Sequence, residues 1–175
     1  MILVRLSWHD DDNPNLIHPE CCKLIYLGNQ HIMLRTRAIV FDERGRLLVQ
    51  HHRNQQPDFY RLPGGGVKYE EKLEDCLIRE IREEANLEIR VNRLIWVRDY
   101  LEGSPYHSIE FFFLATVTGG AFSPMPEAEN IELMYVTIDE LENVVFYPKD
   151  FISKLKLIKE DRGWTELNPY VRSAN

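Results

Sequence analysis

The sequence predicts an α/β/α arrangement, with strands on both sides of one central helix and a second long helix near the C-terminus. The central helix is indicated by apolar residues at a spacing that gives an α-helix one apolar face. These residues are Leu73, Cys76, Leu77 and Ile81. Apolar runs typical of buried strands occur before and after this helix, although periodicity alone leaves the sheet topology open.

Composition fits one soluble globular domain, because 44% of the 175 residues are hydrophobic. The formal net charge of −7 at pH 7 argues against long nucleic acids as partners, since these require basic surfaces. No apolar run approaches membrane-spanning length, so no membrane partner is expected. We therefore expect any nucleotide partner to be a small molecule.

The three cysteines, Cys21, Cys22 and Cys76, form no C-x-x-C pair and suggest no disulfide framework. The first residues are interrupted too soon to form the apolar core of a signal peptide. A reducing, cytoplasmic location is the default interpretation.

The part of the chain before the glycines contains an extension and two predicted strands. Residues 1–30 lack clear periodicity, and their apolar residues need a surface to pack against. We expect this extension to contribute a homodimer contact or to cover one side of the fold. Residues 32–41 and 47–52 have strand composition and flank a turn at residues 42–46, which predicts a hairpin.

The part after the central helix is predicted to contain strands and then a helix. Apolar runs indicate strands within residues 88–101 and 108–117, and a last strand at residues 132–136. Apolar residues at helical spacing predict a helix over residues 149–162, with Gly163 as its stop. The chain thus divides into an N-terminal extension, a central domain and a C-terminal tail, at residues 1–30, 31–162 and 163–175.

Carboxylates interrupt the apolar face of the central helix. A turn of about 100° per residue places Glu80 and Glu84 within that face and Glu83 at its edge. Unpaired carboxylates facing a core are strongly disfavoured and repel one another, so a cation is expected beside them. Oxygen ligands suit Mg²⁺ in particular. A solvated acidic face is the alternative, but the position on the apolar side argues against it.

The same residues form a longer pattern. Five residues separate Gly65 from Glu71, and seven more precede REIREEANL at residues 79–87. This resembles the Nudix box, G-x5-E-x7-R-E-U-x-E-E-x-G-U, where U is apolar. Asn86 stands where the family has glycine. Because Asn is the next most tolerant residue for a left-handed helix end, we expect the cap to survive.

The resemblance implies the Nudix fold, a mixed β-sheet sandwiched between α-helices, over residues 31–162. It implies a hydrolase that uses Mg²⁺ or Mn²⁺ to cleave a nucleoside diphosphate linked to another moiety. ADP-ribose, nucleotide sugars and (d)NTPs are the candidate substrate types, with ADP-ribose-like compounds or nucleotide sugars favoured. The metal would be held by Glu80, Glu83 and Glu84, beside the backbone of Gly65.

Within this resemblance, Arg79 is expected to orient the glutamates by ion pairing. Glu71 lies near the helix start, where a capping role is at least as plausible as metal contact. The general base is left open between a box glutamate, Glu83 or Glu84, and an acid of a later segment. The later candidates are Glu127, Glu129 and Glu132, with the last two preferred because they flank the final strand.

Phosphate contacts are expected from the glycine run and the first predicted hairpin. Gly64 and Gly65 would let the backbone approach phosphate or metal closely. Arg35 and Arg37 are candidate phosphate ligands, and His51 and His52 extend that set. Alternation of polar residues on a half-exposed strand explains these side chains equally well.

Two rival functions follow from the same motif. A Nudix-like module that senses a nucleotide without cleaving it is the first, but such a protein would be expected to lose metal ligands. Isopentenyl diphosphate isomerisation is the second, and it would require a catalytic cysteine in a strand, whereas Cys21 and Cys22 lie in the extension. Mutual repulsion of the acids also predicts that Glu84→Gln leaves the metal-free protein at least as stable as wild type.

Overall fold

The computed structural model describes residues 31–53, 55–101, 106–124, 130–149, 151–160 and 170–172. The chain forms two compact units, residues 1–30 and 31–175, and every described element belongs to the second unit. The predicted extension and its expected dimer contact lie outside the described residues.

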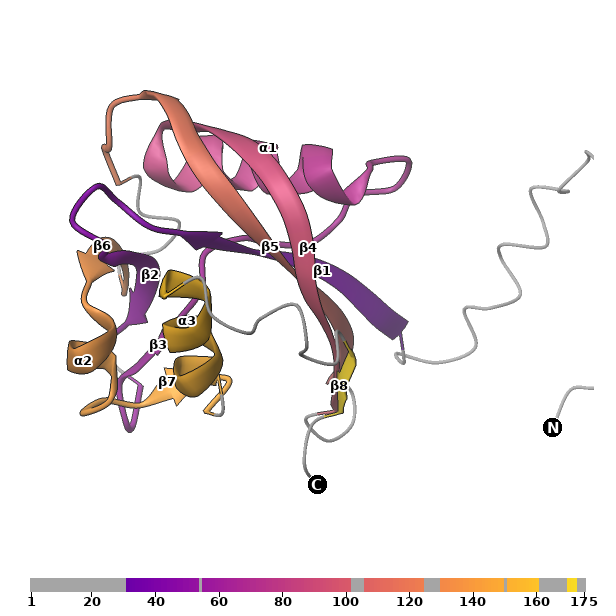
Figure 1. The fold of residues 1–175 in the computed structure, drawn as a ribbon. Coiled ribbons are helices and arrows are strands. Elements are labelled where there is room, and N and C mark those ends of the chain that lie inside the picture. The colour runs from indigo at the N-terminus through magenta and orange to yellow at the C-terminus, as the bar shows by residue number, and fades with distance from the viewer. Residues whose placement is uncertain are drawn as a thin grey trace, which may run out of the picture. The chain divides into compact units, whose positions relative to one another are not determined.

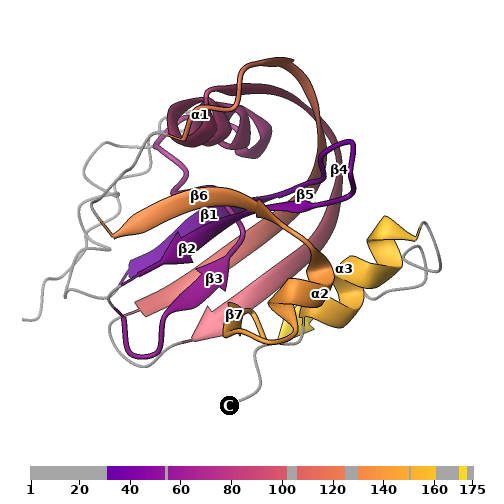
Figure 2. The ribbon, with the colours of Figure 1, turned by 90° about the vertical axis from the view of Figure 1, so that its left-hand side faces the viewer.

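Eight described strands form two four-stranded sheets (Figures 1 and 2). The first sheet has the order β1-β5-β4-β8, with bounds His31–Val40, Tyr106–Gly120, Leu87–Leu101 and Tyr170–Arg172. The second has the order β6-β2-β3-β7, with bounds Ile131–Val136, Leu47–His52, Phe59–Arg61 and Phe146–Tyr147. Both sheets are mixed, since β1 runs parallel to β5 and β3 runs parallel to β7 among antiparallel pairs.

The predicted hairpin of the first two strands is wrong. β1 pairs over its whole length with β5, from His31 opposite Tyr106 to Val40 opposite Ala115. β2 pairs instead with β3 and β6 in the other sheet. Only one bridge, between Phe41 and Leu47, joins the two strands beside the turn. Local composition indicated the strands but not their partners, because the partner of β1 lies far along the chain.

Three strands were not expected from the sequence. β3 lies between the second predicted strand and the glycines, where no strand was predicted, and β7 and β8 follow the strand that was predicted to be the last. Each is only two or three residues long, too short to show a period. β8 lies within the predicted C-terminal tail and pairs with β4.

Helix α1, Leu73–Ala85, forms where the sequence predicts it, and its apolar stripe is buried. It ends at Asn86, which adopts the left-handed conformation with φ 55° and ψ 34°. The amide hydrogen of Asn86 donates to the carbonyl of Arg82, and its side chain donates to the carbonyl of Ala121. The expected cap is therefore present with Asn in the place of glycine.

The two remaining helices are α2, Ile138–Leu141, and α3, Phe151–Lys159. Thr137 and Glu140 form a reciprocal capping box at the start of α2. α3 falls within the predicted range of 149–162 but is shorter. Figure 1 shows α1 on one side of the strands and α2 with α3 on the other, so the α/β fold predicted from the sequence is confirmed.

Two clusters of buried side chains stabilise this arrangement. One lies under α1, where Leu77 and Ile81 pack with residues of both sheets such as Leu48 and Phe113. The other packs α2 and α3 against the strands and includes Phe151. Burying one such side chain contributes about 1.5–3 kcal/mol, so the first cluster holds α1 firmly against the strands and the second holds α2 and α3.

We predict that two substitutions at the α1 cap differ in their effect on stability. Asn86→Ala should lower the free energy of unfolding by about 1–2 kcal/mol, because alanine resists the left-handed conformation. Asn86→Gly should change it by less than about 0.5 kcal/mol, since glycine adopts that conformation freely. Urea unfolding of both variants provides the measurement, and equal destabilisation by the two would contradict the conformational explanation.

Candidate active site

The glycine loop that leads into α1 is attached to the edge of the first sheet by backbone hydrogen bonds. The amides of Thr36 and Ala38 donate to the carbonyls of Gly65 and Pro63, each at 2.9 Å. The amide of Val67 donates to the carbonyl of Leu34 at 3.0 Å. The loop is therefore held in place by β1 and not only by its own turn.

Two glycines in this loop have no space for a side chain. Gly64 has φ +127°, and a Cβ there would lie 2.3 Å from the carbonyl oxygen of Thr36. A Cβ on Gly65 would lie 2.4 Å from the carboxyl carbon of Glu80. No such contact exists at Gly66. The carboxylate of Glu80 thus lies directly against the backbone of Gly65.

Arg79 connects the loop, the start of α1 and two glutamates of the helix. Its Nη1 donates to Glu80 at 2.6 Å and to Glu83 at 3.1 Å, so the expected ion pairs are present. Its Nε donates to Glu71 at 2.7 Å, and its Nη2 donates to the carbonyl of Gly66 at 3.2 Å. This side chain fixes the carboxylates relative to the glycine loop.

Capping of α1, one of the two roles left open for Glu71, does not occur. α1 begins at Leu73 after the N-cap residue Lys72, and the Glu71 carboxylate instead accepts hydrogen bonds from Arg79 and from the amide of Lys68. These bonds, that of Arg79 first, lower the pKa of Glu71 to about 2. They also raise the pKa of Arg79. Glu71 therefore anchors the arginine and stays ionised at any physiological pH.

Glu84 is the most buried of the three box glutamates, with 1% of its surface exposed. Its Oε1 accepts a hydrogen bond from Nε2 of Gln50 at 2.7 Å. Its Oε2 accepts from the amide of Gly64 at 3.2 Å. Glu80 is 7% exposed, whereas the side chain of Glu83 is 56% exposed. The structure therefore places Glu80 and Glu84 against the glycine loop and Glu83 on the outer side.

The carboxylate oxygens of Glu80 and Glu84 beside the glycine loop suit a hard divalent cation. Two buried carboxylates face the glycine loop, with Glu80 packed against the backbone of Gly65, and Mg²⁺ prefers such oxygen ligands together with waters and substrate phosphates. Within the described ranges, no three His, Cys, Asp or Glu side chains converge as a complete metal-binding cluster. A metal bound here would take its remaining ligands from water or substrate.

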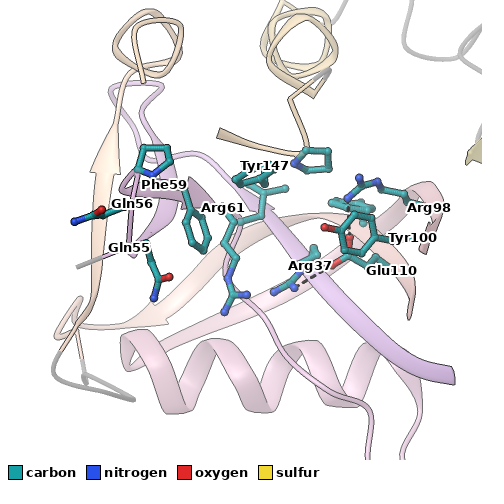
Figure 3. Close-up of a pocket in the computed structure, with 13 residues that line it drawn as sticks. Arg37, Gln55, Gln56, Phe59, Arg61, Arg98, Tyr100, Glu110 and Tyr147 are labelled. Carbon is teal, nitrogen blue, oxygen red and sulfur yellow. Dashed lines mark hydrogen bonds and ion pairs between the residues drawn. The ribbon is translucent and has the colours of Figure 1, made fainter. Parts of the chain in front are cut away.

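A pocket of about 390 Å³ opens beside the glycine loop (Figure 3). Its walls come from both sheets and combine three arginines with aromatic rings. The arginines are Arg37, Arg61 and Arg98, and the rings belong to Phe59, Tyr100, Phe112 and Tyr147. Glu110 is the one acid among the described lining residues. This lining combines positive charge with flat apolar surface, which suits an anion attached to a ring system.

Arg37 is paired within the pocket wall. Its Nε and Nη2 donate to Oε1 of Glu110 at 3.0 and 2.9 Å, and its Nη1 donates to the carbonyl of Gly64 at 3.1 Å. Arg98 contacts the other oxygen of Glu110 at 3.3 Å. Burial alone would raise the pKa of Glu110, but Arg37 and Arg98 hold it below its ordinary value. Arg35, the second predicted phosphate ligand, lies half-buried on the same strand.

The remaining predicted residues are Glu132, Glu129, His51 and His52. Glu132 is on β6 and forms an ion pair with the exposed Arg53, and Glu129 lies outside the described residues. His51 stacks on Tyr60 in the second sheet. His52 is buried, and burial together with Arg61 and Arg37 lowers its pKa to about 4, so it is neutral at physiological pH.

Sequence reasoning missed three residues that the structure brings to the site. Gln50 and Arg61 face each other across β2 and β3, and Glu110 lies between two arginines. A signal existed for Gln50, since it stands two residues after the buried Leu48 and so points to the same inner face of its strand. The partner of Glu110 depends on strand pairing between distant segments, which no local pattern reveals.

Comparison with known proteins identifies the family to which this geometry belongs. The NUDIX domain family model matches residues 32–156, which is most of the chain. The chain belongs to the NUDIX family. Members of this family hydrolyse pyrophosphate bonds, and the present NUDIX protein is accordingly a hydrolase of this type.

Individual relatives agree with this assignment. The ADP-ribose pyrophosphatase of Methanocaldococcus jannaschii is 28% identical over 135 residues, covering 77% of this chain and 75% of that protein. A crystal structure of an ADP-ribose pyrophosphatase from Streptococcus suis superimposes with a TM-score of 0.56 at 24% identity, covering 80% of this chain and 96% of that one. The crystal structure of the MutT protein from Methanosarcina mazei superimposes with a TM-score of 0.59 at 19% identity, covering 75% of this chain and 96% of that one. These two structures support the fold.

None of the described helices of this NUDIX protein has the length and apolar character required to cross a membrane.

We predict that Gly65→Ala inactivates the protein and that Gly66→Ala does not. A methyl group on residue 65 would displace the carboxylate of Glu80, a candidate metal ligand, and a misplacement of about 1 Å in a site costs on the order of 10²-fold in rate. A methyl group on residue 66 meets no atom within 4 Å, so activity should stay within about twofold. Steady-state hydrolysis by the two variants provides the comparison, and full activity of Gly65→Ala would show that Glu80 is not needed in this position.

Proposed function

We propose that this protein is a Mg²⁺- or Mn²⁺-dependent pyrophosphohydrolase that cleaves a nucleoside diphosphate linked to another moiety, with ADP-ribose-like compounds as the favoured substrates. One observation carries the proposal. Gly64 donates its amide hydrogen to the buried Glu84, and its carbonyl accepts a hydrogen bond from Arg37 in the pocket wall. The carboxylates and the cationic pocket therefore meet at a single residue.

The proposed metal ligands are Glu80, Glu83 and Glu84, with the backbone of Gly65 beside them. A bound divalent ion would neutralise the diphosphate and lower the pKa of the attacking water. Arg79 positions Glu80 and Glu83 through its ion pairs. The general base is proposed to be Glu83 or Glu84 or, from a later segment, Glu129 or Glu132. Its efficiency requires that it lie within hydrogen-bond reach of the water.

The pocket provides the support for a nucleoside diphosphate derivative. Arg37, Arg61 and Arg98 offer positive charge for phosphates, while Phe59 and Tyr147 offer rings against which a base can pack. Gly64 and Gly65 are the proposed backbone neighbours of the phosphates, because Gly64 links the pocket wall to Glu84. The similarity to the ADP-ribose pyrophosphatase of M. jannaschii favours ADP-ribose within this class.

A substrate panel tests the proposal. We expect hydrolysis of ADP-ribose or a related nucleotide sugar only when Mg²⁺ or Mn²⁺ is added, and none with EDTA. The panel also contains dinucleoside polyphosphates and (d)NTPs, and released phosphate-bearing products are quantified by chromatography. Tight binding of one compound without turnover of any would support the rival sensing function.

Substitution of two glutamates separates metal ligation from general negative charge. Glu84→Gln should reduce kcat by about 10²-fold or more, because it removes a charged ligand from the buried site. Glu74→Gln removes the same charge from the exposed side of α1 and should leave kcat within about twofold. A Glu84→Gln protein with full activity at limiting Mg²⁺ would contradict the metal-ligand assignment.

The contacts of Glu84 change the expected stability of this variant. Both carboxylate oxygens accept hydrogen bonds, from Gln50 and from the amide of Gly64. A glutamine at residue 84 would place its NH₂ group opposite one of these donors, which leaves buried donors unsatisfied. We therefore expect Glu84→Gln to lower the Tm of the metal-free protein, instead of leaving it unchanged or raised as repulsion alone predicts.

A further inference from the structure

Arg61 is a half-buried cation whose charge is poorly matched by its surroundings. Among the residues that the structure describes, its guanidinium has one hydrogen-bond partner, the neutral amide oxygen of Gln50, at 2.8 Å from Nε. The other two arginines of the pocket wall, Arg37 and Arg98, both contact the carboxylate of Glu110. A guanidinium carries five N–H donors, and among the described residues only Nε of Arg61 has a hydrogen-bond partner, in a side chain that lines the pocket.

Electrostatic effects at Arg61 point the same way. Burial, followed by repulsion from Arg37 and Arg35, lowers the pKa of Arg61 to about 10. Glu84 and Glu110 attract the guanidinium and offset only part of these effects. The side chain stays charged at neutral pH, but the folded protein disfavours that charge. An anion in the pocket would compensate the positive charge of Arg61 and would accept charge-assisted hydrogen bonds from its guanidinium.

Gln50 connects Arg61 to the carboxylate site. It is fully buried on β2, directly opposite Arg61 of β3. Its amide nitrogen donates to Oε1 of Glu84 at 2.7 Å, and its amide oxygen accepts from Arg61. Only one orientation of the amide satisfies both neighbours, because a carboxylate requires a donor and a guanidinium requires an acceptor. Gln50 thus fixes Arg61 at a set distance from Glu84.

We propose that Arg61 is an anion-binding residue of the pocket that takes a phosphate group, and that Gln50 positions it relative to Glu84. The planar fork of the guanidinium matches two oxygens of one phosphate. Figure 3 shows Arg61 projecting from its strand beside Arg37, where a ligand in the pocket would reach both. That the phosphate belongs to a nucleoside diphosphate derivative rests on the proposed function.

Binding of inorganic pyrophosphate, measured by calorimetry on the full chain in metal-free buffer, tests the role of Arg61. Arg61→Gln should weaken the Kd by about 10- to 100-fold, the loss expected for hydrogen bonds to a charged group. Arg44→Gln is the control, since it removes the same charge from an exposed turn and should change the Kd by less than about twofold. Equal binding by wild type and Arg61→Gln, or no binding by wild type, would overturn the proposal.

Stability provides a second readout. If Arg61 stabilised the fold, replacing it would lower the Tm. If its charge is instead poorly compensated, replacing it should leave the Tm unchanged or raise it. If Arg61→Gln fails to fold, Arg61→Lys takes its place. Lysine keeps the charge but loses the fork, so it should bind pyrophosphate about threefold to tenfold more weakly.

A double-mutant cycle tests the role of Gln50. Gln50→Met retains the length of the side chain and removes both hydrogen bonds, so it should weaken pyrophosphate binding by about three- to tenfold in the wild-type background. In the Arg61→Gln background, the same substitution should have no further effect on the Kd. Equal losses in both backgrounds would show that Gln50 acts only on the fold.

These measurements are independent of turnover. Arg61-dependent pyrophosphate binding without hydrolysis of any compound in the substrate panel would refute the proposed function and leave the anion site in place. Hydrolysis of ADP-ribose with Arg61-independent pyrophosphate binding would refute the anion site alone.

Discussion

The backbone of Gly64 is the constraint on which the site depends. Its amide donates to Glu84 of α1, and its carbonyl accepts from Arg37 of the first sheet. The two hydrogen bonds of this one residue therefore fix the helix relative to the sheet. The loop keeps this position because β1 pairs with it through Thr36 and Ala38. Small movements of this loop would shift the carboxylates and the pocket together, so the proposed chemistry requires a rigid loop.

Charge is organised around this loop in two layers. On the helix side, Arg79 forms ion pairs with Glu71, Glu80 and Glu83. On the pocket side, Glu110 forms ion pairs with Arg37 and Arg98. Each layer thus contains one residue of opposite sign that holds several like charges together against their repulsion. Gln50 joins the layers as a neutral link, because it contacts both Glu84 and Arg61.

The central helix and its carboxylates were predictable because they follow from local periodicity, and so was the left-handed cap at Asn86. The pairing of β1 with β5 was not, since residues as far apart as His31 and Tyr106 must meet for it to form. The same limit hid Glu110, whose partner Arg37 lies 73 residues away. Capping by Glu71 was considered because that residue lies near the helix start in the sequence. Its contact with Arg79 depends on the path of the loop, which the sequence pattern does not describe.

The contrast between the glycine loop and the pocket walls has an evolutionary consequence. Gly64 and Gly65 admit no side chain, so a substitution there would displace Thr36 or Glu80 whatever the substrate. Gln55 and Gln56 are exposed at the pocket rim, and changes at these positions would disturb neither β1 nor α1. Substrate preference can therefore change by substitution at the rim while the glycine loop and the proposed hydrolytic centre keep their geometry.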